Sequence, residues 1–123
     1  MKILLSINPE YVEKIFSGEK KFEYRRSIFK NQKIKTVVIY STSPVKKIVG
    51  EFTIKKIIKD IPTKLWDLSP EFTGISEDKF YKYFENKEEG YAIEIGKVKK
   101  YKKYKLLEEF SIKTPPQSFL YLP

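Results

Sequence analysis

Charged side chains of types that bind anions or move protons gather in one short stretch, as Lys20, Glu23 and Arg25. Residues two apart in a β-strand point to the same face, so Glu23 and Arg25 are expected to orient each other. Arg25 and Arg26 are the two arginines among 25 basic residues, and a planar guanidinium suits a phosphate, a carboxylate or a base edge. We predict that these four residues contact a ligand. The alternative is an internal ion pair that only orders the sheet.

The residues that are missing also restrict the chemistry. The chain contains no cysteine and no histidine. Disulfides, thiolate nucleophiles, Cys/His zinc sites and imidazole bases are therefore excluded. Any catalysis must come from carboxylates, lysines, hydroxyls or backbone amides, and a Lys20–Glu23 acid–base pair is the arrangement we single out. No clustered Asp and Glu residues offer a magnesium site, so we expect neither a metal nor a cofactor.

A small polar turn at Thr42 and Ser43 follows a strand-like segment and precedes Pro44. Its hydroxyl and amide groups could donate hydrogen bonds to a ligand, so we place both residues at the rim of the predicted site. A turn of this kind also ends many strands without any function. Gly50 predicts either a bulge in a curved sheet, which we favour, or the close approach of a ligand or another backbone.

A lysine run with interleaved tyrosines lies at 97–105. Lysines neutralise phosphates and tyrosines stack on bases, so this run predicts a nucleic-acid surface. The residues assigned to it are Lys97, Lys99, Lys100, Tyr101, Lys102, Lys103 and Tyr104. The alternative is a solvated hairpin whose lysines protect a sheet edge. The net charge of +9 favours an anionic partner, although lysine enrichment can also reflect a compositional bias.

The segments around these residues predict an α+β fold. A helix is expected after Asn8, with Pro9 in its first turn and Gly18 at its end, and shorter helices begin at Pro62 and Ser76. Strands are expected at 2–7, 20–26, 35–41, 47–58, 91–98 and in the tail. Because strands follow one another along the chain, we predict a small, curled, open mixed β-barrel flanked by short helices.

The length and apolar content predict a single domain over 1–123. No apolar run approaches the ~20 residues that cross a bilayer, so we expect a cytoplasmic protein without a membrane partner.

The stretch at 18–25 fits the pattern Gly-x-Lys-x-x-Glu-x-Arg, the signature of ASCH domains. The segments Tyr40–Pro44, Val49–Phe52 and Pro115–Phe119 extend the similarity over nearly the whole chain. The chain thus resembles the ASCH branch of the PUA-like fold. This resemblance implies an association with RNA and a cleft lined by the motif residues.

The leading interpretation is a non-catalytic module that binds RNA or a modified nucleotide. The alternative is a small hydrolase, because one ASCH branch is similar in fold and acts as an amidohydrolase on acetylated cytidine with a Lys, a Thr and a Glu. Lys20 matches that lysine, but the threonine would fall at Glu23 and the glutamate near Thr73, where the closest acid is Glu71. We therefore lean against catalysis. A protein-interaction accessory domain has no positive feature in its favour.

Overall fold

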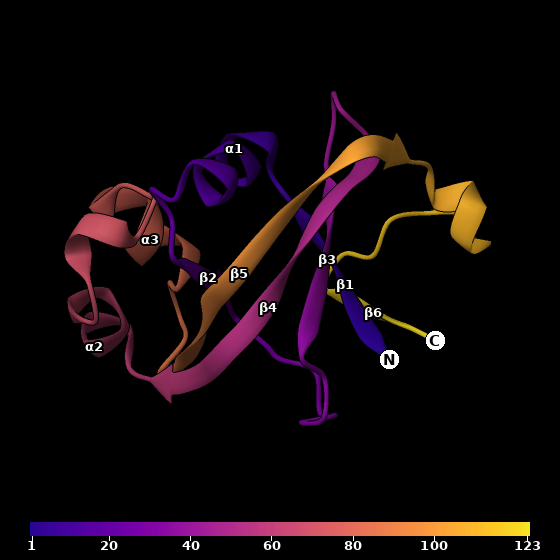
Figure 1. Ribbon diagram of the computed structural model, residues 1–123. Helices are drawn as coiled ribbons and strands as arrows, with labels where there is room; N and C mark the ends of the chain where they lie inside the picture. Colours follow the sequence, from indigo (N-terminus) through magenta and orange to yellow (C-terminus); the bar gives the residue numbers. More distant parts are fainter.

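Six strands form one sheet in the computed structural model, which describes residues 1–123 (Figure 1). The strands are β1 (Lys2–Ile7), β2 (Phe22–Arg25), β3 (Thr36–Ser41), β4 (Lys47–Asp60), β5 (Gly90–Lys105) and β6 (Phe119–Leu122). Their order is β2-β5-β4-β3-β1-β6; β1 and β3 are parallel, and the other neighbours are antiparallel. The helices are α1 (Pro9–Ser17), α2 (Pro62–Asp67) and α3 (Glu77–Tyr83), with 3₁₀ turns η1 (Pro70–Phe72) and η2 (Leu107–Phe110). The predicted α+β class and mixed sheet are confirmed.

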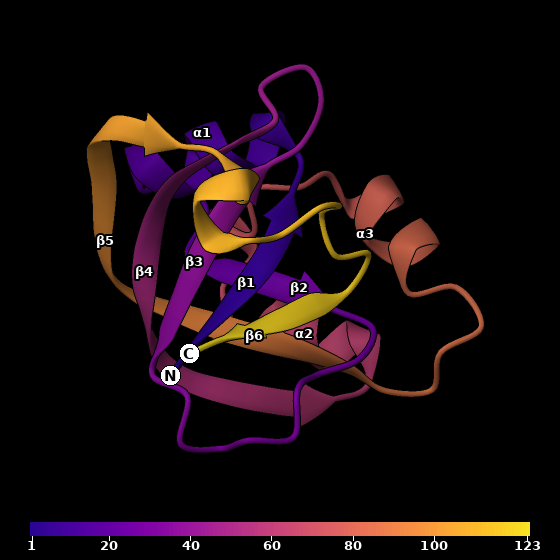
Figure 2. The same ribbon diagram turned by 90° about the vertical axis from the view of Figure 1, so that its right-hand side faces the viewer.

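The two edge strands, β2 and β6, approach each other because the sheet curls (Figure 2). Arg25 at the end of β2 donates from Nη2 to the carbonyl of Ser118, just before β6, at 2.6 Å. The Ser27 and Ser118 hydroxyls are 3.3 Å apart. These contacts join the edges without a continuous backbone ladder, as expected for a small open barrel.

Helix ends lie where the capping residues predict them. The Asn8 side chain accepts a hydrogen bond from the Glu10 amide, and Gly18 ends α1 with a left-handed φ of 88°. Ser76 caps α3 by accepting from the Lys79 amide at 3.3 Å. Both N-caps, and the stop at Gly18, confirm the sequence prediction.

The two long strands differ from the prediction. β5 continues to Lys105 as one extended strand instead of stopping near residue 98, and it pairs with β4 over most of its length. β4 has the bulge predicted at Gly50, where the register shifts. A side chain at this position would collide with the β5 backbone and with Phe16 of α1, so the close approach of another backbone is present as well.

Two hydrophobic clusters hold the helices against opposite parts of the sheet. One packs α1, through Val12 and Ile15, onto β1 and β3. Another packs α2 and α3 onto β2, through Leu65, Phe80 and Phe84. The space between α1 and α3 is bordered by the end of β1 and by β2. Among the helices, none has the length and apolar character needed to span a membrane.

Candidate functional site

A pocket of about 170 Å³ opens between α1, β2 and α3. The three charged motif residues that the sequence singles out, Lys20, Glu23 and Arg25, all line it. The remaining lining residues are Ser6, Ile7, Asn8, Tyr11, Tyr24, Ile75 and Tyr83. We call this the motif pocket. The structure thus brings the predicted charges together, whereas their role in binding a ligand stays a prediction.

Lys20 is buried at the base of this arrangement, with 3% of its surface exposed. Its Nζ donates to the Thr73 carbonyl at 3.0 Å and lies 4.6 Å from the centre of the Tyr24 ring. Burial lowers the pKa of Lys20 to about 8; Glu23 partly opposes this shift, and Lys14 adds to it. Lys20 therefore loses its charge around pH 8, where an exposed lysine would remain charged.

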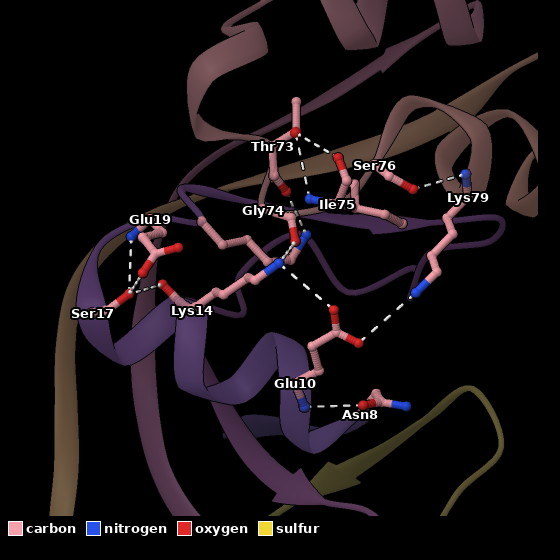
Figure 3. Close-up of polar contacts among 11 residues, drawn as sticks. Asn8, Glu10, Lys14, Ser17, Glu19, Thr73, Gly74, Ile75, Ser76 and Lys79 are labelled. Atoms are coloured by element: carbon pink, nitrogen blue, oxygen red, sulfur yellow. Dashed lines mark hydrogen bonds and ion pairs between the residues drawn. The ribbon is translucent and has the colours of Figure 1, made fainter.

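The turn before α3 holds two lysines in place. Lys14 of α1 donates to the Gly74 carbonyl at 3.2 Å, next to the carbonyl that Lys20 uses. Gly74 has a φ of 68°, and a Cβ there would overlap the aliphatic part of Lys20. Figure 3 shows Lys14 and Lys79 on either side of Glu10, whose carboxylate oxygens lie 3.7 and 4.0 Å from the two amines. Helix α1 is thereby fixed against the Thr73–Lys79 segment.

Glu23 and Arg25 form a nearly buried ion pair, with Arg25 Nη1 3.3 Å from a Glu23 carboxylate oxygen. Arg25 also donates to the Ser118 carbonyl, so the internal ion pair that the sequence analysis gave as the alternative is present, while contact with a ligand stays a prediction. The pair lines the motif pocket, and it also orders the sheet.

Three tyrosines complete the motif pocket, and the sequence analysis missed all three. The Tyr24 hydroxyl is buried and is the one buried side-chain polar atom without a hydrogen-bond partner. Burial, with a contribution from Glu23, raises the pKa of Tyr24, so its hydroxyl stays protonated. Tyr11 and Tyr83 also line the pocket. The available signal was weak: Tyr24 lies inside the motif, but strand alternation assigns its ring to the core.

Other predicted ligand residues lie outside this pocket. Arg26 is exposed and donates from Nη1 to the Tyr83 carbonyl at 3.2 Å. Thr42 and Ser43 form the turn after β3, where the Thr42 amide donates to the Ile7 carbonyl at 3.1 Å. Neither residue lines the motif pocket, although Ile7, to which the Thr42 amide donates, does. Their expected place at its rim is therefore wrong.

The lysine run forms the second half of β5. It is an extended strand bordered by β4 on one side, since β2 pairs only with residues 91–94 of β5. The Tyr101 hydroxyl donates to Glu51 at 2.7 Å, while Tyr104 is 37% exposed. None of the six lysines lines the motif pocket. The alternative of a hairpin is wrong, because the run belongs to one extended strand, but its lysines do lie along a sheet edge.

Two of the three residues of the amidohydrolase arrangement, the threonine and the glutamate, are not reproduced. Thr73 stands where the resemblance places the glutamate; it is buried and donates from Oγ1 to the Ile75 carbonyl at 3.0 Å. Glu71 is exposed in η1 and lies outside the pocket. No group of three or more acidic side chains comes together in a way that would hold a metal ion.

The curled mixed sheet and its motif pocket define a PUA-like fold of the ASCH type. Residues 5–116 match the ASCH domain, and the chain belongs to this family. The crystal structure of ASCH from Zymomonas mobilis is similar, with a TM-score of 0.89, 27% identity and coverage of 99% of this chain and 87% of that one.

Two curated relatives differ in length from this chain. A protein of Zymomonas mobilis named "ASCH domain-containing ribonuclease" is 31% identical over 90 residues, covering 73% of this chain and 61% of that protein. A Ureaplasma parvum protein named "ATP synthase subunit alpha" is 33% identical over 121 residues, covering 98% of this chain. The chain spans only 15% of the length of this second relative.

Proposed function

We propose that this chain binds RNA and holds one nucleotide in the motif pocket. The observation that carries the proposal is the convergence of Lys20, Glu23 and Arg25 in one pocket beside the unpartnered Tyr24 hydroxyl. The cations complement a phosphate, while Glu23 and Tyr24 supply an acceptor and a polar hydroxyl for a base or a ribose. The pocket volume of about 170 Å³ is below the roughly 300–1,000 Å³ of sites that enclose drug-sized ligands, so it suits one group of a longer chain.

A second candidate function is RNA cleavage. It is favoured by the pKa of about 8 at Lys20, near the value at which an amine acts as a general base in neutral solution. The name of the Zymomonas mobilis ribonuclease supports it. Hydrolysis of an acetylated nucleoside is less well supported, because Glu23 and Thr73 stand where the amidohydrolase branch has a threonine and a glutamate.

In such a cleavage, the neutral Lys20 amine would take the proton from a ribose 2′-hydroxyl. The 2′-oxygen would attack the neighbouring phosphorus, and the bond from phosphorus to the 5′-oxygen would break. The Tyr24 hydroxyl, which has no partner within the protein, would protonate the leaving oxygen. The products would be a 2′,3′-cyclic phosphate and a free 5′-hydroxyl end.

The test compares binding and cleavage in matched lysine variants. Binding is measured by fluorescence anisotropy with a labelled 12-nucleotide 2′-fluoro RNA, which cannot cyclise, and cleavage is measured with the unmodified strand. Lys20→Met should weaken binding about tenfold or more, since a hydrogen bond from a charged group is lost, and should abolish any cleavage. Lys21→Met is the control, because Lys21 is exposed, lies over Phe72 and is outside the pocket.

Different results would contradict the two candidate functions. A wild-type chain that binds no RNA at 100 µM protein would contradict the binding proposal. Cleavage that survives in Lys20→Met would remove Lys20 from the role of base and leave binding untouched.

A further inference from the structure

A larger groove lies away from the motif pocket, between the segment 26–35 and the second half of β4. Its volume is about 700 Å³. Figure 2 shows the chain between β2 and β3 passing beside the far end of β4. We call this the basic groove. Nothing in the site described above accounts for it.

The charge of the basic groove has one sign. Five lysines line it and no acidic residue does: Lys30, Lys35, Lys55, Lys56 and Lys59. Two of them form ion pairs at the outside, Lys55 with Glu94 at 3.6 Å and Lys59 with Glu89 at 3.9 Å. Lys30, Lys35 and Lys56 have no acidic partner within 4.0 Å. Three uncompensated cations around one concavity predict an anionic occupant.

Apart from Gln32, the rest of the lining is apolar and aromatic. Ile57 is 38% exposed here, and Tyr91 lies beside it with the Lys59 amine 5.9 Å from its ring centre. A half-exposed tyrosine and apolar side chains offer surface on which bases can stack while the lysines contact phosphates. An inorganic anion would make no use of this surface.

The wall formed by the segment 26–35 is held in place before any ligand binds. Phe29 and Ile34 are each 4% exposed and anchor the segment in the core. The Tyr121 hydroxyl accepts hydrogen bonds from the amides of Lys30 and Asn31, both at 3.1 Å. A preorganised wall lowers the ordering cost of binding.

The basic groove and the motif pocket are connected by consecutive residues. Arg25 lines the pocket, whereas Arg26 and Ser27 line a hollow of about 370 Å³. This hollow shares Ile28, Lys59 and Tyr91 with the groove, and it also contains Lys87, Glu88 and Glu89. Residues 25–30 therefore lead from one site to the other.

We propose that the basic groove binds the part of a single-stranded RNA that extends from the nucleotide in the motif pocket. This inference rests on the proposed function. It assigns the sequence-independent affinity to the groove instead of the lysine run at 97–105. A single strand fits, because its bases are free to turn onto Tyr91 and the isoleucines, whereas a duplex keeps its bases stacked inside.

The experiment uses two charge-matched triple variants of the full chain. One is Lys30→Gln, Lys35→Gln, Lys56→Gln in the groove. The other is Lys97→Gln, Lys102→Gln, Lys103→Gln in the run, where the lysines are exposed and make no ion pair. Binding of the 12-nucleotide 2′-fluoro RNA and of a trinucleotide is measured by anisotropy at several salt concentrations.

The groove variant should bind the 12-nucleotide strand about tenfold more weakly and have a salt slope smaller by about 2, since three phosphate contacts at about 0.7 each are lost. Its affinity for the trinucleotide should stay within twofold of wild type. The run variant should bind both within about twofold of wild type. Cross-linking of a 4-thiouridine strand to Tyr91 would give direct support.

Equal losses in both triple variants, or a loss only in the run variant, would overturn the groove assignment while leaving RNA binding in place. An equal loss of affinity for a poly-glutamate peptide in the groove variant would assign the groove to acidic proteins instead. If neither RNA binds the wild type, both this inference and the proposed function are wrong.

Discussion

Lys20 shows how one residue combines burial with charge. An ordinary lysine has a pKa near 10.4, and burial alone would make a charged amine costly. Burial lowers the pKa of Lys20 to about 8, and the nearby Glu23 carboxylate limits that fall. The residue therefore changes charge in a range where solution experiments are simple.

Stability should depend on pH through Lys20. Its pKa is lower in the folded chain than in the unfolded chain, so between about pH 8 and 10.4 the unfolded state binds a proton that the folded state does not. The free energy of unfolding of the wild type should therefore rise relative to Lys20→Met, by about 2 kcal/mol between pH 7.5 and 9.5. Urea denaturation of both chains at four pH values measures this, and the difference between them isolates Lys20 because all other titrating groups are shared. A difference that does not change with pH would contradict the lowered pKa.

The sequence predicts the charged residues of the motif pocket better than its tyrosines. Lys20, Glu23 and Arg25 differ from their surroundings in charge and spacing, so they can be recognised without a structure. Tyr24 resembles any aromatic residue in a half-buried strand, and only the tertiary packing leaves its hydroxyl without a partner. Thr42 and Ser43 were misplaced for the opposite reason: a polar turn is visible in a sequence, but the direction in which it points is not.

At the scale of elements, the four-residue strand β2 has two roles: it lines the motif pocket and it joins the edges of the barrel. Its last residue, Arg25, lines the motif pocket, whereas Arg26, directly after the strand, lines the neighbouring hollow. Arg25 also joins β2 to the segment before β6 through Ser118. The two arginines therefore have different structural roles despite being adjacent.

A comparison of the two arginines tests this difference. Arg25→Lys should lower the free energy of unfolding by about 1–3 kcal/mol, because one amine cannot serve both Glu23 and the Ser118 carbonyl in their buried positions. Arg26→Lys, at an exposed residue, should change it by less than about 0.5 kcal/mol. Urea denaturation with tryptophan fluorescence measures both. Equal effects would mean that Arg25 does not hold the two strands together.

The elements themselves were predicted where local chemistry decides them. Asn8, Pro9 and Gly18 mark the limits of α1 by their own hydrogen bonds and dihedral angles. The predicted end of β5 was wrong. Lysine by itself disfavours strands, whereas pairing with β4 extends this strand to Lys105. Pairing partners are a tertiary property that a local pattern does not contain.

For the whole molecule, the lysine run has a clear structural role even without nucleic acid. The second half of β5 has a neighbour on one side only, so its other edge carries free backbone groups. Lysines along such an edge oppose its pairing with a second chain. They also contribute to the net charge of +9, which keeps copies apart.

Removing this protection should cause self-association. Lys97→Thr, Lys102→Thr, Lys103→Thr introduces a residue that favours strands and lowers the net charge from +9 by three. Light scattering after size-exclusion chromatography should show larger species at 100 µM protein. The same three changes at Lys30, Lys35 and Lys56 lower the charge equally but leave the edge intact, so that control should keep the wild-type size. If both variants associate equally, the cause is net charge and not the edge.

The closing contacts of the barrel also have a consequence for the order of events during synthesis. Ser6, which lines the motif pocket, donates to the Pro116 carbonyl at 2.7 Å, and Arg25 is held by Ser118. The pocket therefore depends on residues more than 90 positions apart in the chain. While a ribosome is still adding residues before 118, α1 and β2 can form, but Arg25 lacks one of its two partners. In a growing chain, the motif pocket would thus be complete only after this late segment has emerged.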